Sequence, residues 1–300
     1  MIKEVNFKIS NKLLYKLNNI FGKIKLCLLI FLSIYFINIK LNSIFNNLKN
    51  KNKVYKLKNH PLKTSIKIIK ICLCVMGKEE NLYAKEYVTH YKKLGYNHIF
   101  LYDNNDINGE RFEDVIEEEI KEGFISLINY RGKRGNKEKL GGPQLEIYYD
   151  CYEKNNKNYD WLSFFDFDEF LVLRNNESIQ EFFNHKRFEK CQNIKINFLY
   201  YSDNELLYYD NRNIQERFVV PLLNHSNNSV IKSTVRGRLK ENYWKKTYGA
   251  HTSLMNYTSC NSEGKIISFN SFTNTPFNSS YIILKHYYTK SVEEYCNKVQ

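Results

Sequence analysis

From about residue 66 onward, the chain alternates short apolar runs with stretches in which apolar residues recur every three or four positions. Four runs have the length and the β-branched and aromatic content of strands: 66–76, 98–102, 125–130 and 161–165. The periodic stretches predict helices at 81–94, about 112–120 and about 144–154. Gly95 and Gly123, which follow the first two of these helices, are typical of helix ends.

This alternation of strand and helix predicts an α/β fold with a mainly parallel sheet flanked by helices. Ligands of such sheets bind at the carboxyl ends of the strands. Acidic clusters at 103–106 and 166–169 follow the second and fourth predicted strands, so we expect both clusters on one edge of the sheet. Beyond residue 175 the pattern is less regular. We interpret that part as the second half of the same domain, with room for an acceptor site.

The N-terminal segment contains one apolar run, 26–39, bounded by Lys25 and Lys40 and preceded by further lysines. As a helix it spans roughly 21 Å, less than the hydrocarbon core of about 30 Å, and lysines at both ends can reach the interfaces. A basic flank before an apolar run is typical of an uncleaved signal anchor with a cytosolic N-terminus. A cleaved signal peptide and an interfacial or buried core helix are the alternatives. The Asn- and Lys-rich stretch 46–65 is interpreted as a stem or linker.

Charge is divided unevenly along the chain, whose formal net charge is +13. Residues 1–70 hold fifteen lysines and a single acidic residue, Glu4, whereas the remainder holds 30 basic and 31 acidic residues. A nucleic-acid-binding domain usually carries its basic surface on the folded part. The basic segment here surrounds an apolar run, which favours a membrane surface as partner and argues against nucleic acid.

The seven cysteines are odd in number and sparsely spaced, and no two form a C-x-x-C pair. This spacing argues against a structural zinc site and gives no sign of a disulfide framework.

Three acidic residues stand together after the apolar run WLSFF, within the segment DFDEF. Asp166 and Asp168 flank a single residue, so on an extended strand their side chains would point to the same side. Two neighbouring carboxylates repel each other unless a cation relieves them. Mg²⁺ or Mn²⁺ is the usual answer, with substrate phosphates completing the coordination. The motif therefore predicts a divalent cation that neutralises a departing diphosphate.

Four segments in order carry a resemblance to a known family: 74–106, CVMGKEENLYAKEYVTHYKKLGYNHIFLYDNND; Gln144 with Asp150-Cys151 and DWLSFFDFDEFL; KSTVR at 232–236 followed by His251; and HYYTKSVEEYCNK at 286–298. Together they resemble glycosyltransferase family 92, of the GT-A fold, over about residues 69–300. With the division that composition and pattern indicate, we expect 1–45 as basic segment and membrane anchor, 46–65 as stem or linker, and 66–300 as a GT-A-like glycosyltransferase domain, the last as the resemblance implies.

The resemblance implies a nucleotide-sugar donor, a UDP-sugar with galactose as one candidate sugar, together with Mn²⁺ or Mg²⁺. It implies a glycan, glycoprotein or glycolipid acceptor and a single-pass type II membrane protein, in the Golgi or endoplasmic reticulum if the cell is eukaryotic. The implied site residues are Glu80 and Asp103 beside the nucleoside, Asp166 and Asp168 beside ribose and metal, and His251 or His286 at the metal or diphosphate.

An inverting transferase, as the resemblance suggests, needs a carboxylate to deprotonate the acceptor, and the candidates are Asp203, Glu205 and Glu216. Two alternatives stay open. One is a metal-dependent phosphohydrolase with Asp166 as nucleophile and Asp168 as acid. The other is an inactive, membrane-tethered protein that binds sugar nucleotides or glycans. It is motivated by Glu79, where the family has Asn, and by FLYYSDNE in place of the family's residues before the acceptor region.

Overall fold

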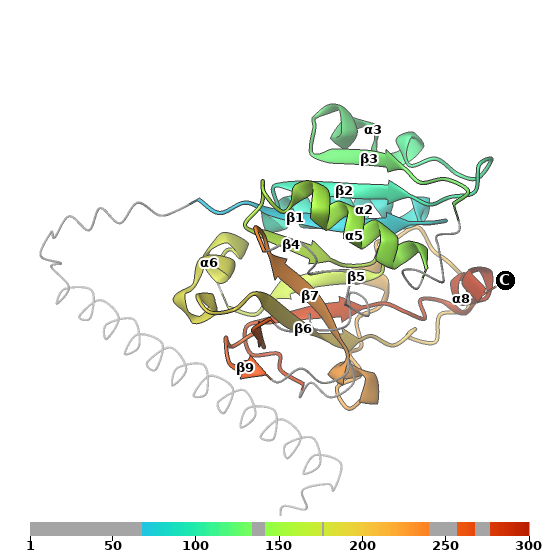
Figure 1. Cartoon of the computed structure of the whole chain (residues 1–300). Coiled ribbons are helices and arrows are strands. Elements are labelled where there is room, and N and C mark those ends of the chain that lie inside the picture. The colour runs from blue at the N-terminus through green and yellow to red at the C-terminus, as the bar shows by residue number, and fades with distance from the viewer. Residues whose placement is uncertain (1–67, 134–141, 176, 240–256, 268–276, 300) are drawn as a thin grey trace, which may run out of the picture. The chain divides into compact units, whose positions relative to one another are not determined.

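The structure is a computed structural model that describes residues 68–133, 142–175, 177–239, 257–267 and 277–299 (Figure 1). The chain divides into two compact units, Met1–Ser65 and Ile66–Gln300, and all described residues belong to the second. The predicted anchor and linker therefore lie outside the described residues. Within the described part, no helix combines the length and the apolar character needed to cross a membrane.

The first half of the folded unit follows the predicted alternation of strands and helices closely. Its elements are β1 (Ile71–Gly77), α2 (Asn81–Leu94), β2 (His98–Asp103), α3 (Glu113–Lys121), β3 (Ile125–Asn129), α5 (Pro143–Asn155) and β4 (Trp161–Phe164). The four strands pair in parallel in the order β3-β2-β1-β4. Gly95 ends α2 in the left-handed conformation, with φ of 99°, and its N–H donates to the carbonyl of Lys92.

The second half is mixed in strand direction, so the expectation of a mainly parallel sheet is wrong for this part. Its elements are β5 (Glu169–Leu173), α6 (Ile179–Asn184), a 3₁₀ turn (Lys186–Phe188), β6 (Asn193–Tyr200), α7 (Ile214–Arg217), a 3₁₀ turn (Ser226–Ser229), β7 (Ile231–Arg236), β8 (Ser259–Cys260), β9 (Ile266–Ile267), β10 (Ile282–His286) and α8 (Val292–Val299). The sheet continues as β4-β7-β6-β10-β5. Among these pairs only β6 and β10 are parallel. The described residues of the second half also lack the long helices that connect the parallel strands of the first half, since α6 and α7 are only six and four residues long.

The sheet separates two apolar layers, because alternate residues of β1 face opposite sides. Leu73 and Val75 pack with Tyr87 of α2, in a core to which α3 and α6 also contribute. Cys72 belongs to the second core, where Tyr148 of α5 packs. The helices α2, α3 and α6 therefore cover one face of the sheet and α5 covers the other.

Two disulfides, of which the cysteine spacing in the sequence gives no sign, cross-link the unit. Cys74 of β1 is bonded to Cys151 of α5, and Cys191, just before β6, is bonded to Cys260 of β8. The partners are 77 and 69 residues apart in sequence. Linear spacing conveys nothing about such pairs, because the sheet and its packing bring them together.

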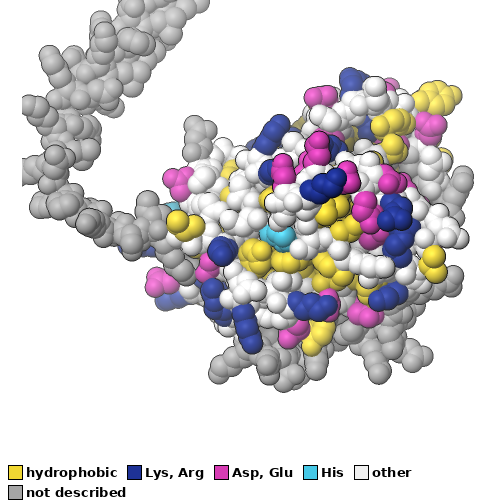
Figure 2. All heavy atoms as spheres, turned by 90° about the horizontal axis from the view of Figure 1, so that it is seen from above, with side chains coloured by type: hydrophobic (Ala, Val, Ile, Leu, Met, Phe, Trp, Pro, Cys, Tyr) yellow, Lys and Arg dark blue, Asp and Glu magenta, His cyan; other side chains and the backbone are white. Residues whose placement is uncertain are grey.

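The surface of the folded unit carries intermixed charges, in keeping with its near-neutral composition. Figure 2 shows lysine and arginine side chains interspersed with aspartate and glutamate on the face that it draws. This face presents no continuous basic surface of the kind that binds nucleic acid.

Candidate functional site

The acidic segment forms a turn between β4 and β5, not the extended strand that the sequence predicts. The N–H of Glu169 donates to the carbonyl of Asp166 at 3.1 Å, which closes the turn. The N–H of Asp166 in return donates to Glu169 Oε2 at 2.9 Å. Strand β4 ends at Phe164, so the alternation expected of an extended strand does not apply to Asp166 and Asp168. Their carboxylates meet different partners.

The carboxylate of Asp166 is held by three donors. The Nε2 of Gln144 and the hydroxyl of Tyr148, both from α5, donate to Oδ1 at 2.9 and 2.7 Å. The ammonium of Lys232, a fully buried residue of β7, donates to Oδ2 at 2.7 Å and also lies 3.4 Å from Glu169. Burial on its own raises the pKa of Asp166, but the charge of Lys232 together with the hydrogen bonds from Lys232 and Tyr148 outweighs it, and the pKa lies below its ordinary value.

Asp168, Glu169 and His286 converge into one buried cluster. One ligand atom from each lies within 4.8 Å of the others. His286 is in antiparallel register with Glu169 across β10 and β5, which explains why these two residues meet. Its Nε2 lies 3.6 Å from Asp168 Oδ1. The N–H of Tyr287 donates to the carbonyl of Asp168 at 2.9 Å and fixes the turn against β10.

The donor set of this cluster fits Mn²⁺ or Mg²⁺. Two of its buried atoms, Glu169 Oε1 and His286 Nδ1, find no hydrogen-bond partner among the described residues. A cation about 2.1 Å from each ligand would hold the ligand atoms at most about 4.2 Å apart, so small side-chain movements suffice. Burial, together with the charges of Asp166 and Asp168, raises the pKa of Glu169 well above its ordinary value. A divalent cation would relieve this excess of buried negative charge.

A pocket of about 450 Å³ lies beside the cluster, lined by Lys78, Glu79, Glu80, Leu82, Tyr83, Lys290, Glu294, Asn297 and Lys298. Lys298 joins pocket and cluster, because its Nζ donates to Asp168 Oδ2 at 2.9 Å. Glu80 faces Lys290 at 3.5 Å. Burial raises the pKa of Glu80 to about 7, against the opposing effect of the Lys290 charge. The structure thus brings the predicted residues Glu80, Asp168 and His286 into one region.

Asp103 does not line this pocket, although Asn105, two residues on, accepts a hydrogen bond from the N–H of Glu79 at 2.7 Å. The carboxylate of Asp103 accepts from the N–H of Asn105 at 3.0 Å and from Arg131 at 2.6 Å. Arg131 also donates to backbone carbonyls of the loop after β2, so the pair closes that loop. Asp103 lines a second pocket, of about 560 Å³, that shares no residue with the first. Glu80 and Asp103 are therefore not brought together in one pocket.

The three predicted base candidates lie on the segment after β6 and line neither pocket. The carboxylate of Asp203 accepts from the hydroxyl of Ser202 and from the N–H of Glu205 within a local turn. Glu205 and Glu216 are exposed. The segment nonetheless starts near the cluster, since Tyr200 at the end of β6 is in register with His286.

His251, the remaining predicted ligand, lies outside the described residues. The candidate residues from sequence omit two groups that matter to this site, Glu169 and Lys232. A signal for Lys232 is present in the sequence, because a lysine inside a strand segment such as IKSTVR is rarely buried without a partner of opposite charge. The pattern does not say which carboxylate.

One known protein family matches most of the chain. The family model of glycosyltransferase family 92 matches residues 67–299. The chain belongs to glycosyltransferase family 92. This membership confirms the predicted resemblance, and the family's name agrees with the predicted enzyme class.

Two curated family 92 proteins are similar to part of the chain. One from Ricinus communis is 27% identical over 121 residues, which is 40% of this chain and 19% of that protein. One from Oryza sativa subsp. japonica is 22% identical over 111 residues, which is 37% of this chain and 18% of that protein. The matched regions span less than a fifth of these family 92 relatives.

A solved structure, that of S. aureus TarS, is similar over 43% of this chain and 21% of its own, with 10% identity and a TM-score of 0.31. That similarity is too weak to support any conclusion. The family 92 assignment rests on the sequence match.

Proposed function

We propose that the protein is a metal-dependent glycosyltransferase that moves a sugar from a nucleotide-sugar donor to a hydroxyl group. One observation carries the proposal: Asp168, Glu169 and His286 form a buried set of ligand atoms at the edge of a lysine-lined pocket. A divalent cation bound there supplies positive charge to a departing nucleoside diphosphate.

The side chains around the cluster suit an anionic donor. Lys78, Lys290 and Lys298 line the pocket and attract a diphosphate. Lys232 offsets the buried charge of Asp166 and Glu169 from the opposite side, so that the carboxylates remain close together without full mutual repulsion. Glu80, at the entrance side of the same pocket, is placed to contact the donor.

The finer features of the proposal rest on the resemblance. They are a UDP-sugar donor with galactose as candidate sugar, a glycan, glycoprotein or glycolipid acceptor, inversion at the anomeric carbon, and a base among Asp203, Glu205 and Glu216. Asp203 is favoured by its position three residues beyond the strand end that adjoins His286. A type II membrane location, in the Golgi or endoplasmic reticulum of a eukaryotic cell, is supported by the two disulfides, because such bonds form in oxidising compartments.

The test compares the 300-residue chain, in detergent, with Asp168→Asn and with the control Asp114→Asn, an exposed acid on α3. UDP at about 100 times its Kd, with Mn²⁺, should stabilise the fold by about 2.7 kcal/mol and raise the Tm by roughly 5–10 °C. The shift should need Mn²⁺, vanish in Asp168→Asn and persist in Asp114→Asn.

Turnover separates the three functions considered for the chain. Release of UDP from UDP-sugars, dependent on Mn²⁺ and on Asp168, supports the transferase. Binding without any turnover would identify an inactive sugar-nucleotide-binding protein. Release of inorganic phosphate from phosphoesters would favour the phosphohydrolase and overturn the proposal, as would a UDP-induced shift that Asp168→Asn retains.

A further inference from the structure

We propose that Lys298 competes with the divalent cation for Asp168, so that its ammonium must leave before a metal ion binds. This inference rests on the metal site of the proposed function. Lys298 Nζ lies 2.9 Å from Asp168 Oδ2, whereas Oδ1 of the same carboxylate faces His286. The ammonium thus takes the carboxylate oxygen that the rest of the cluster leaves available.

Simultaneous binding of both cations to this oxygen is unfavourable. An ammonium at 2.9 Å and a metal ion at about 2.1 Å from Asp168 Oδ2 would lie no more than about 5 Å apart. Like charges at that separation repel strongly where the surroundings are dry, and the side chain of Asp168 is only 6% exposed. One cation therefore excludes the other.

The two lysines of the cluster differ in their freedom to leave. Lys232 is fully buried between Asp166 and Glu169, so its ammonium cannot move into solvent by a change of rotamer. The side chain of Lys298 is 40% exposed and borders the pocket, so its ammonium can return to water by a change of rotamer. Lys232 is the fixed cation of the cluster and Lys298 is the exchangeable one.

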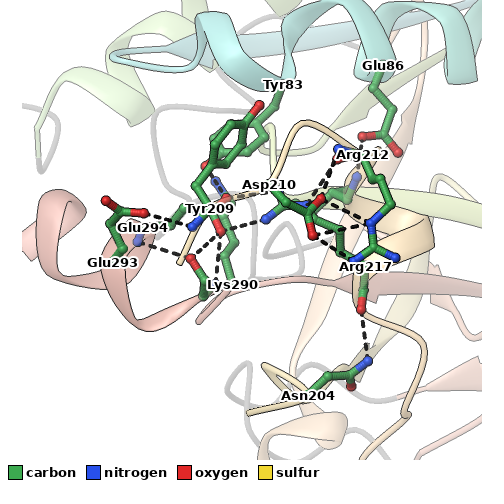
Figure 3. A network of polar contacts seen from close by, with 12 residues as sticks. Tyr83, Glu86, Asn204, Tyr209, Asp210, Arg212, Arg217, Lys290, Glu293 and Glu294 are labelled. Carbon is green, nitrogen blue, oxygen red and sulfur yellow. Dashed lines mark hydrogen bonds and ion pairs between the residues drawn. The ribbon is translucent and has the colours of Figure 1, made fainter. Parts of the chain in front are cut away.

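The helix that carries Lys298 is held independently of this exchange. Arg217 donates to both carboxylate oxygens of Glu294 on α8, at 2.7 and 2.9 Å, and the hydroxyls of Tyr83 and Ser291 donate to the same carboxylate (Figure 3). These contacts are buried and do not involve Asp168. Release of Lys298 therefore requires a movement of one side chain and leaves α8 in place.

The experiment measures Mn²⁺ affinity by electron paramagnetic resonance without nucleotide, so that it does not depend on catalysis. Lys298→Met removes the charge and keeps the length, and it should tighten Mn²⁺ binding at least fivefold, equivalent to about 1 kcal/mol. Lys298→Arg keeps the charge and should bind Mn²⁺ within about twofold of the wild type. Lys154→Met is the matched control, because Lys154 contacts Asp150 at 2.8 Å on α5.

Unchanged or weaker Mn²⁺ binding by Lys298→Met would overturn the inference, since removal of a cation that competes for Asp168 must tighten the site. Asp168→Asn separates this failure from failure of the proposed function. If Mn²⁺ binds the wild type, is lost in Asp168→Asn and is not tightened in Lys298→Met, only the inference falls. If Mn²⁺ binds no variant, or binds independently of Asp168, the metal site falls and the inference with it.

Discussion

Glu79 adopts a backbone conformation that its own side chain disfavours. Its φ is 59°, in the left-handed region, and its N–H donates to Asn105 Oδ1 at 2.7 Å. Asn enters this region more readily than Glu, and Asn is the residue that the family resemblance places here. The side chain of Glu79 is 67% exposed. The departure from the family pattern at Glu79 therefore strains the backbone at the rim of the pocket. It does not change any residue of the buried cluster.

Lys232 offers a prediction at the same scale. Lys232→Met should lower the free energy of unfolding by about 3 kcal/mol or more, because Asp166 and Glu169 would lose their buried countercharge. Adding Asp166→Asn to Lys232→Met should recover part of the loss. Urea denaturation of the single and double variants measures both effects.

Lys195 provides the matched control, since it is also buried and its strand position faces Ser233 on the neighbouring β7. No carboxylate partner of Lys195 occurs among the described residues, and burial lowers its pKa. Lys195→Met should therefore cost little or even stabilise. Equal losses of unfolding free energy in Lys232→Met and Lys195→Met would show that pairing with the buried carboxylates is not the reason why Lys232 stabilises the fold.

Candidate site residues can be named from the sequence where the motif is local, but not where their meeting depends on strand register. Asp168 and His286 are identifiable as candidates because they stand in recognisable motifs. The place of Glu169 in the cluster depends on its pairing with His286, which is more than a hundred residues away. No local pattern encodes that pairing. Asp103 also stands in a recognisable local motif. The sequence does not show, however, that Arg131 donates to its carboxylate.

At the scale of elements, α8 is held by a buried ion pair between Glu294 and Arg217. The carboxylate of Glu294 is 4% exposed and faces Arg217. Burial raises the pKa of this carboxyl, but the bonds from Arg217, Ser291 and Tyr83 outweigh burial and lower it from 4.5 to about 2. A carboxyl whose pKa is depressed by folding stabilises the fold above its unfolded pKa and ceases to do so as the pH falls through the folded value.

The pH dependence of α8 anchoring follows from this sign. At pH 7 the wild type should be more stable than Glu294→Gln, and the difference should shrink as the pH falls from about 4.5 to about 2. Thermal melts of both proteins across this range test the expectation. A difference that stays constant with pH would show that the ionised carboxylate is not what holds the helix.

The elements themselves were predictable in the first half of the folded unit and much less so in the second. The helix α2 begins and ends where its apolar spacing and Gly95 predict. Beyond residue 175, the helices are too short to show a period, and β8 and β9 have two residues each. Such strands exist only because distant neighbours pair with them, so the mixed sheet could not be derived from local pattern.

For the molecule as a whole, the two disulfides close loops of about seventy residues or more. Cys191→Ser with Cys260→Ser should lower the free energy of unfolding by about 2–5 kcal/mol. Alkylation of the unfolded wild type should modify Cys74, Cys151, Cys191 and Cys260 only after reduction. Cys296, an exposed free thiol, should react in the folded protein and serves as the internal control. Labelling of the four disulfide cysteines without reductant would contradict the cross-links.

The place of β10 in the sheet has a consequence for how the protein folds during its synthesis on the ribosome. Strand β5 has β10 as its partner in the sheet, and more than a hundred residues separate the two in the chain. At a synthesis rate of 5–20 residues per second, those residues take roughly 5–20 s to be made. During that time β5 is without its β10 partner. A nascent chain interrupted in that interval holds Glu169 without His286. The proposed metal site therefore cannot assemble until β10 has been made.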